Sequence, residues 1–238
     1  MSGTVYGGIY APIAIKNTPY MGEIIDLYQE SFAALPWNER SKCPVYPDIK
    51  NEGCAEGYSG LSVGSNCGDC NNLITEEAYP HDELYEKFTT ELPDSYRLWY
   101  LEKQGDNGAI IMAALARVTT VNALTEQLEE STPELSGWIK EKYQDSESKI
   151  VWIEDVFANT ELRPKGNLKN FGKMCTLFAL GTESTEIAYK TFNPKLVRAA
   201  QRDFGSDVTI ADPVFEQIPG RNRFVSIKLQ SEAISNAA

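Results

Sequence analysis

Histidine is almost absent from this chain of 238 residues, which contains a single example, His81. A catalytic triad uses a histidine to take the proton of its nucleophile, and a histidine-rich metal centre needs several imidazoles. The sequence therefore argues against both kinds of site. We expect His81 to be an ordinary surface residue or a satisfied residue rather than an acid–base group.

Basic residues are also in short supply, because 22 lysines and arginines stand against 34 aspartates and glutamates. The formal net charge of −12 opposes binding to nucleic acid, since affinity for phosphates comes mainly from lysine and arginine. The same charge favours cationic substrates or basic partners, and it also has the simpler explanation of solubility. We expect no nucleic-acid partner.

Long apolar runs are missing as well. No stretch approaches the roughly 18–20 apolar residues that a membrane helix needs, and the first residues lack the basic and apolar segments of a signal peptide. Apolar residues nevertheless make up 42% of the chain, enough for a sizeable core. We therefore expect a folded, soluble, cytoplasmic protein, monomeric or homodimeric, with no membrane association.

The chain does contain a long series of helix and strand patterns. In order, they indicate a strand at 4–16, helices at 20–34 and 75–88, strands at 96–103 and 109–119, short helices within 121–148, a strand at 150–158, a helix at 167–180, a strand at 186–192, a helix at 194–204, and strands at 208–210 and 223–229. This order predicts a single α/β or α+β domain over residues 1–238.

The strand pattern at 150–158 is apolar on both faces, as expected of a central strand that is covered on both sides. Glu154 and Asp155 interrupt it with two adjacent carboxylates. Side chains alternate along a strand, so we expect these two to point to opposite faces of the sheet. Carboxylates inside an apolar strand cost free energy unless they are solvated or paired, which indicates a cleft at this place.

A short basic loop, from Arg163 to Leu168, follows this strand and leads into the next helix. Free backbone N–H groups at a helix start bind anions, Gly166 allows a phosphate to approach closely, and Lys165 adds positive charge. Neither the glycine-rich dinucleotide fingerprint nor the P-loop pattern is present in the sequence. Taken alone, a loop of this composition favours the simpler interpretation as an ordinary basic loop.

The run from Ile153 to Leu168 resembles the coenzyme A-binding motif of the GNAT N-acyltransferase superfamily. In that family a central strand leads into an Arg/Gln-x-x-Gly-x-Gly/Ala loop and then a helix. The segment from Asn193 to Gly205 resembles the next strand–helix motif of the family, and residues 36–39 resemble its substrate-side loop. The resemblance covers 20–40 and 95–229 in element order and is specific at residue level over 150–205.

The resemblance implies a mixed, mostly antiparallel central sheet flanked by helices, with a cysteine-rich loop insert. It implies transfer of an acyl group, acetyl in the first instance, from acetyl-CoA to a primary amine. Glu154 would be the general base, because an apolar strand raises the pKa of a carboxyl towards neutrality. The residues implied to bind the cofactor, including backbone N–H groups that polarise the thioester, are Phe157, Ala158, Arg163, Lys165, Gly166, Asn167, Leu168 and Asn193.

Two positions depart from the family pattern. Leu168 stands where the family has Gly or Ala, and Gln201 stands where many members carry a tyrosine as general acid. Glutamine cannot titrate, so another group, such as Tyr189, would protonate the leaving thiolate, or no acid is required. These departures leave two alternatives open: a non-catalytic GNAT-like protein that binds a partner, and an enzyme that transfers longer acyl chains, including chains from a carrier protein.

The acceptor side is the most variable part of the family, so the sequence does not identify the amine. The negative net charge favours a cationic acceptor, such as a polyamine, an aminoglycoside-like amine or a protein lysine.

Four of the five cysteines lie in the loop-rich insert over residues 41–72, with the spacing C-x10-C-x12-C-x2-C. The two-residue spacing of the last pair is typical of metal or redox sites in a cytosolic protein. Four thiolates would suit a structural zinc ion, which would also supply the core that this segment lacks. Two disulfides, an iron–sulfur site and unpaired thiols are the alternatives. The candidate metal ligands are Cys43, Cys54, Cys67 and Cys70.

Overall fold

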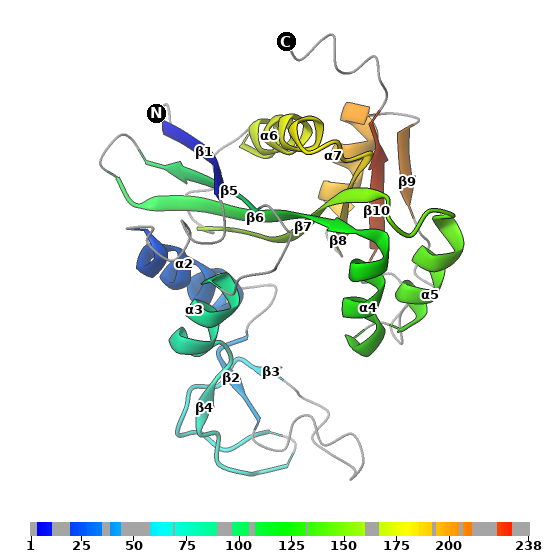
Figure 1. Ribbon diagram of the computed structural model, residues 1–238. Helices are drawn as coiled ribbons and strands as arrows, with labels where there is room; N and C mark the ends of the chain where they lie inside the picture. Colours follow the sequence, from blue (N-terminus) through cyan, green and yellow to red (C-terminus); the bar gives the residue numbers. More distant parts are fainter. Residues whose placement is uncertain are drawn as a thin grey trace.

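A seven-stranded sheet forms the centre of the computed structural model, with the strand order β1-β5-β6-β7-β8-β10-β9 (Figure 1). The structure describes residues 4–10, 20–34, 39–43, 58–68, 70–89, 97–104, 108–131, 133–159, 167–191, 194–204, 207–210 and 223–229. The strands are β1 (Thr4–Tyr10), β5 (Arg97–Lys103), β6 (Ile110–Thr120), β7 (Lys149–Ala158), β8 (Glu186–Thr191), β9 (Val208–Ile210) and β10 (Arg223–Lys228).

Every neighbouring pair in this sheet is antiparallel except β7 and β8, which run parallel. A parallel pair needs a crossover connection, and the helix between these two strands provides it. The predicted fold class, a mixed and mostly antiparallel sheet with helices on its faces, is confirmed.

The helices divide between the two faces of the sheet (Figure 1). α2 (Met21–Ala33) and α3 (His81–Thr89) pack on one face, and α4 (Val121–Ser131) and α5 (Pro133–Lys142) cover the other end of the same face. α6 (Asn167–Gly181) and α7 (Pro194–Phe204) pack on the opposite face. Within the described residues, no helix is both long and apolar enough to cross a bilayer.

α6 shows why the sequence folds in this way. Its buried side chains recur three and four residues apart, so they form one stripe along the helix that meets the sheet. Burial of this stripe against strands β5 to β8 removes large apolar surfaces from water, which is the main favourable contribution to folding. The buried residues of the stripe are Phe171, Cys175, Phe178 and Ala179.

The cysteine-rich insert differs from the sequence expectation in its local structure. A second, three-stranded sheet, in the order β3-β2-β4, lies in the insert and in the residues that follow it. Its strands, β2 (Ser41–Lys42), β3 (Tyr58–Ser59) and β4 (Glu76–Glu77), are two residues long. The helix expected over 75–88 begins only at His81, because residues 76–77 pair with β2 instead.

Candidate active site

β7 contains a one-residue bulge at Glu154. Leu115 of β6 pairs with Asp155, and the next residue, Ala116, pairs with Ile153, so Glu154 has no pairing partner on β6. A bulge of this kind shifts the alternation of side chains by one residue. The expectation that Glu154 and Asp155 point to opposite faces is therefore wrong, because both carboxylates point towards the face covered by α2 and α3.

The ion pairs of the two carboxylates agree with this placement. The Oε1 atom of Glu154 lies 2.7 Å from Nε of Arg117, a residue of β6. The Oδ2 atom of Asp155 lies 2.9 Å from Nζ of Lys87, which belongs to α3. The bulge thus places two charged pairs side by side on the sheet surface below α2 and α3.

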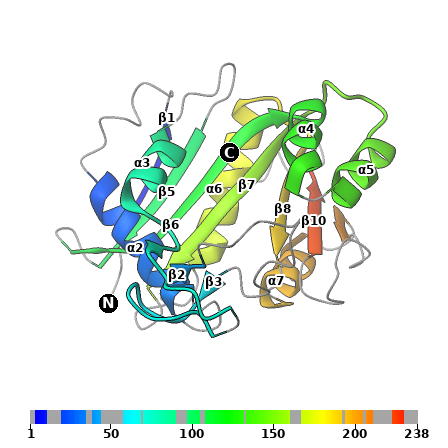
Figure 2. The same cartoon turned by 90° about the horizontal axis from the view of Figure 1, so that it is seen from below.

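β7 and β8 separate immediately next to the bulge. Their parallel pairing covers four residue pairs, from Ile150–Glu186 to Ile153–Tyr189, and no further β7–β8 pair occurs among the described residues. β7 continues for five more residues to Ala158. Figure 2 shows the two strands diverging beyond this point. The sheet therefore opens into a wedge whose edge on one side is the second half of β7.

The backbone direction on this edge follows from two hydrogen bonds. The N–H of Asn159 donates to the carbonyl of Ile111 at 2.9 Å, so this N–H points towards β6. Backbone groups alternate along an antiparallel strand, so those of Ala158 and Val156 point away from β6, into the wedge. The carbonyl of Ala158 accepts a hydrogen bond from the Ser31 hydroxyl of α2 at 3.0 Å. By the same alternation, the N–H of Phe157 points to β6.

Glu154 is a buried carboxyl group that lies close to two buried arginines. The side chains of Glu154 and Arg117 are 16% and 8% exposed, and Arg97 lies close enough to act on the same carboxyl. Burial raises the pKa of Glu154 above its ordinary value, although the two arginines act in the opposite direction. Nε of Arg117 makes no aligned hydrogen bond, so charge rather than directed bonding holds this pair together.

Asp155 has a different environment. Nζ of its partner Lys87 also donates to the hydroxyl of Tyr28 at 3.3 Å, so the lysine links α3, α2 and β7. Burial raises the pKa of Tyr28 to about 12, so this phenol stays protonated at neutral pH. These contacts give Asp155 a place in holding α3 against β7.

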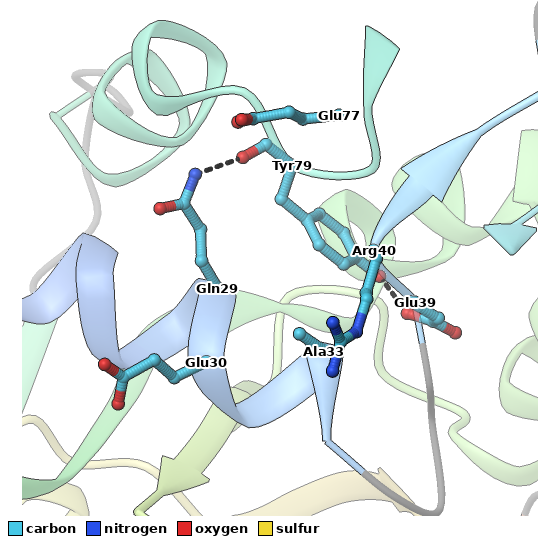
Figure 3. A pocket seen from close by; sticks show the side chains of 7 residues that line it. All are labelled: Gln29, Glu30, Ala33, Glu39, Arg40, Glu77 and Tyr79. Carbon is cyan, nitrogen blue, oxygen red and sulfur yellow. Dashed lines mark hydrogen bonds between the residues drawn. The ribbon is translucent and has the colours of Figure 1, made fainter. Parts of the chain in front are cut away.

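A pocket of about 280 Å³ opens beside the second half of α2 (Figure 3). Glu39 lies inside it and accepts a hydrogen bond from the hydroxyl of Tyr79. Burial raises the pKa of Glu39, and the bond from Tyr79 partly offsets this effect. Three glutamates and a single arginine give the lining an excess of negative charge. The lining residues are Gln29, Glu30, Ala33, Glu39, Arg40, Glu77 and Tyr79.

A cluster of aromatic rings connects the pocket to β7. The ring of Tyr28 lies edge-on to Tyr79 at 5.2 Å between centroids and edge-on to Phe157 at 5.0 Å. Phe88 completes the packing against Tyr28 and Phe157. Because the cluster is buried and closely packed, it fixes the position of the pocket relative to the wedge.

The structure describes only part of the predicted cofactor site. Phe157 is buried in the aromatic cluster, and Ala158 lies at the edge of the wedge. Asn167 and Leu168 open α6, which follows β7, and α7 likewise begins directly after β8. The N-termini of both helices therefore follow the diverging strand ends, where their N–H groups suit an anion. Outside the described residues lie Arg163, Lys165, Gly166 and Asn193.

Tyr189, the candidate general acid, and Gln201, which stands at the family's usual acid position, are both among the described residues. The hydroxyl of Tyr189 donates to the carbonyl of Leu196 at 3.2 Å, a contact that ties β8 to α7. Burial raises the pKa of Tyr189 to about 12, so the phenol remains protonated at neutral pH. Gln201 is exposed on α7.

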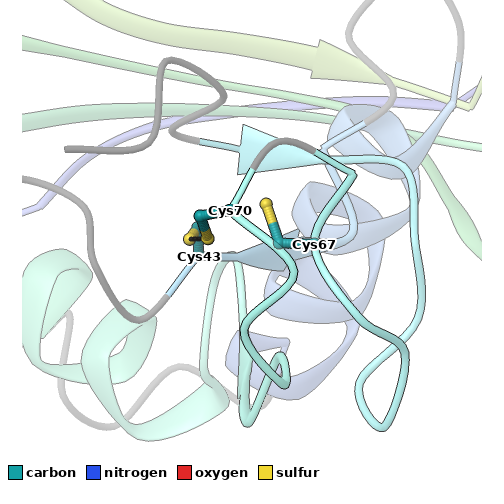
Figure 4. Close-up of side chains that lie close together, drawn as sticks. All are labelled: Cys43, Cys67 and Cys70. Atoms are coloured by element: carbon teal, nitrogen blue, oxygen red, sulfur yellow. Dashed lines mark hydrogen bonds between the residues drawn. The ribbon is translucent and has the colours of Figure 1, made fainter. Parts of the chain in front are cut away.

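Three of the four candidate metal ligands come together. The Sγ atoms of Cys43, Cys67 and Cys70 all lie within 4.8 Å of one another (Figure 4). Cys54 lies outside the described residues.

Several residues of this site were not found from the sequence. Arg117 and Arg97 carried a usable signal, because each is a charged residue within an apolar strand pattern, as Glu154 is. The pocket residues Glu30, Glu77 and Tyr79 carried none, since they come from separate segments that only the tertiary structure brings together.

A double-mutant cycle tests the Glu154–Arg117 pair. A raised pKa means that folding favours the neutral carboxyl, so this contribution is present at low pH and is lost as the pH rises through the raised pKa. Glu154→Gln, which is always neutral, should therefore be at least as stable as the wild type at neutral pH. Arg117→Met should cost about 3–5 kcal/mol, because it leaves a buried carboxylate without its nearest cation.

The double variant Glu154→Gln/Arg117→Met should recover most of that loss. The measurement is the free energy of unfolding in urea, determined for the wild type, the two single variants and the double variant. Arg202→Met serves as the control, since this arginine is 70% exposed on α7. If Arg117→Met has the same free energy of unfolding as the wild type, Arg117 does not compensate the charge of Glu154.

No protein-family model and no curated protein sequence matches the chain. Among solved structures, the polyamine N-acetyltransferase of Drosophila melanogaster is similar over 95% of this chain and 100% of its own, with a TM-score of 0.52 at 9% identity. A mosquito arylalkylamine N-acetyltransferase-like protein covers 95% and 100% of the two chains, with a TM-score of 0.48 at 8% identity. FeeM, an N-acyl amino acid synthase from uncultured soil microbes, covers 95% and 92%, with a TM-score of 0.47 at 11% identity.

Identities this low establish the fold and nothing finer. The TM-score of 0.52 with the Drosophila structure extends over 95% of this chain, so the similarity is one of the whole fold. The chain has the fold of the GNAT N-acyltransferases, as the motif over residues 150–205 predicted.

Proposed function

We propose that the chain is an acyl-CoA-dependent N-acyltransferase that transfers an acetyl group from acetyl-CoA to a primary amine. The wedge between β7 and β8 is the observation that carries this proposal. Beyond Ile153 the edge of this central strand has no described pairing with β8, and by alternation the N–H groups of Val156 and Ala158 point away from β6. Glu154, a buried carboxyl of raised pKa, lies two residues before Val156.

The wedge suits the donor for chemical reasons. The pantetheine arm of coenzyme A is an extended chain with two amide groups, and such a chain can pair with the exposed edge of β7 as another strand would. Its pyrophosphate would then meet the loop of Arg163, Lys165 and Gly166 and the start of α6, with Asn193 at the start of α7. The N–H of Ala158 would polarise the thioester carbonyl and stabilise the negative charge that develops on it.

Glu154 would act as the general base. An ammonium ion has no free electron pair, so the acceptor must lose a proton before it attacks the thioester. A carboxylate with a raised pKa accepts this proton more readily than an ordinary one, either directly or through a water molecule. Glu154 and the pocket lie on the same face of the sheet, so the acceptor would enter from the side of α2 and α3.

The acidic pocket supports a cationic acceptor. Glu30, Glu39 and Glu77 line it together with the aromatic ring of Tyr79, and carboxylates and aromatic faces both bind ammonium groups. An acceptor with two or more amino groups could place one charged nitrogen there while another, uncharged nitrogen reacts. The fold of the polyamine N-acetyltransferase is in keeping with this substrate class.

Calorimetric titration with acetyl-CoA tests the donor. We expect micromolar affinity in the wild type and none in Gly166→Trp, because the indole would fill the space that a phosphate needs. Gly137→Trp is the matched control: Gly137 is exposed on α5 with nothing near its Cβ position, so binding should persist. If the wild type does not bind acetyl-CoA, the acetyltransferase proposal fails, and longer acyl donors and a protein partner become the alternatives.

Glu154→Gln tests the base. The variant should bind acetyl-CoA normally but lose about 10²- to 10⁴-fold in kcat, the usual contribution of a general base. In the wild type, kcat/KM should fall as the pH drops through the raised pKa of Glu154, because protonation removes the base, and the variant should lack this limb. Asp155→Asn, the neighbouring carboxylate on the same face, should keep the limb. If Glu154→Gln has the same kcat and the same pH profile as the wild type, Glu154 is not the general base.

The double variant Glu30→Gln/Glu77→Gln tests the pocket with a diamine and a monoamine of equal length. KM for the diamine should rise about tenfold, which corresponds to about 1.4 kcal/mol for the lost attraction. KM for the monoamine should change little, since its single nitrogen reacts and must be uncharged. Added salt should weaken diamine binding to the wild type. Equal changes in KM for the diamine and the monoamine would show that the second charge of the diamine does not bind in the acidic pocket.

A further inference from the structure

Three cysteine side chains converge in the insert, far from the wedge in sequence. Cys43 follows β2 directly, while Cys67 and Cys70 occupy the connection between β3 and β4. The Sγ atoms of Cys43 and Cys70 lie 3.5 Å apart, and all three sulfurs lie within 4.8 Å of one another. A disulfide requires about 2.05 Å, so no disulfide joins Cys43 and Cys70. Thiolates on one tetrahedral zinc ion lie about 3.8 Å apart, since each Zn–S bond is about 2.3 Å.

The backbone around Cys67 and Cys70 forms a tight reversal that holds both sulfurs on one side. The N–H of Asn71 donates to the carbonyl of Cys67 at 3.0 Å, and the N–H of Cys67 donates to the carbonyl of Asn72 at 2.8 Å. Asn71 adopts a φ of 57°, a left-handed conformation that asparagine tolerates better than most residues. This tight turn therefore brings the two cysteines close together.

A hydrogen bond also reaches one of the sulfurs. Nδ2 of Asn72 lies 3.4 Å from Sγ of Cys70 and donates to it. A donor of this kind stabilises a thiolate more than a thiol, because hydrogen bonds to charged acceptors are the stronger ones. The group that binds a metal is the thiolate, so this contact favours the ligand form of Cys70.

Among the described residues of the insert and those that follow it, the local core consists almost entirely of these cysteines. Its buried members are Cys43, Cys67 and Ile74, with Cys70 packed against them. Cys43 is 0% and Cys67 2% exposed. Three strands of two residues and one isoleucine bury too little apolar surface to hold a segment of this length, and segments with so small a core generally need a metal or a covalent link.

We propose that Cys43, Cys67 and Cys70 bind one structural Zn²⁺ ion as thiolates. Each thiol loses its proton on binding, and the ion ties the residue after β2 to the reversal between β3 and β4. Soft sulfur ligands in a closed, loop-rich site suit zinc, which imposes no geometry beyond the tetrahedron. Cys54, the other candidate ligand from the sequence, lies outside the described residues.

The site also holds one wall of the acidic pocket. The strands that the ion joins carry pocket residues at their ends: Arg40 precedes β2, Glu77 ends β4, and the N–H of Ala78 donates to the carbonyl of Arg40 at 3.1 Å. Loss of the ion should therefore loosen the pocket while leaving the wedge intact. This link to the acceptor rests on the proposed function, whereas metal binding itself does not.

Metal analysis of the purified full-length protein is the first test. We expect about one zinc ion per chain in the wild type, the same content in Cys175→Ser, and loss of zinc in Cys67→Ser and Cys70→Ser. Cys175 is the matched control for Cys67→Ser because it is similarly buried but lies in the main core on α6. Cys70→His, which keeps a zinc-binding side chain, should retain the ion.

Two measurements on the wild type do not depend on the folding of any variant. A strong chelator should lower the melting temperature, and replacement of the ion by Co²⁺ should give the intense visible absorption of tetrahedral cobalt thiolate. Acetyl-CoA titration of the chelated protein separates this proposal from the proposed function, because the wedge should still bind the donor. Zinc-free wild-type protein, iron in place of zinc, or full zinc content in Cys67→Ser would overturn the proposal.

Discussion

The extra residue at Glu154 is the constraint on which the rest of the site depends. A regular strand would send Glu154 and Asp155 to opposite faces. The bulge instead places both carboxylates on the α2–α3 face, where Arg117 and Lys87 compensate their charge. It also coincides with the last β7–β8 pair, so the buried acid and the open strand edge occur at the same place in the chain.

Much of the fold could be predicted because its elements have strong local patterns. The apolar run of β7, the buried stripe of α6 and the proline at the first position of α7 each follow from the sequence over a few residues. The bulge could not be predicted in this way, since a bulge is defined by the register of the partner strand. The start of α3 was misplaced for a similar reason: residues 76–77 have helical character but pair with β2.

The residues of the candidate site also fall into two groups: those that local sequence patterns identify and those that only the tertiary structure identifies. Glu154 was found because a carboxylate within an apolar strand needs an explanation, and the cysteine insert was found because its spacing is unusual. The partners of Glu154 and the acidic pocket come from segments that are distant in sequence, so only the tertiary structure identifies them. The roles of Arg163, Lys165, Gly166 and Asn193 remain those that the family resemblance implies.

The short seam between β7 and β8 has a mechanical consequence. Among the described residues, four β7–β8 residue pairs and one adjoining backbone hydrogen bond, from the N–H of Thr185 to the carbonyl of Lys149, join the half-sheet β1-β5-β6-β7 to the half-sheet β8-β10-β9. α6 packs against strands of both halves. A ladder of four residue pairs gives little resistance to bending. The angle between the two half-sheets therefore depends largely on how the buried side chains of α6 pack against the strands on either side of the β7–β8 junction. A change in the size of a residue such as Phe178 should therefore change the angle between the two halves. If the proposed function is right, such a change would alter the space for the acyl chain without altering a residue of the proposed donor site.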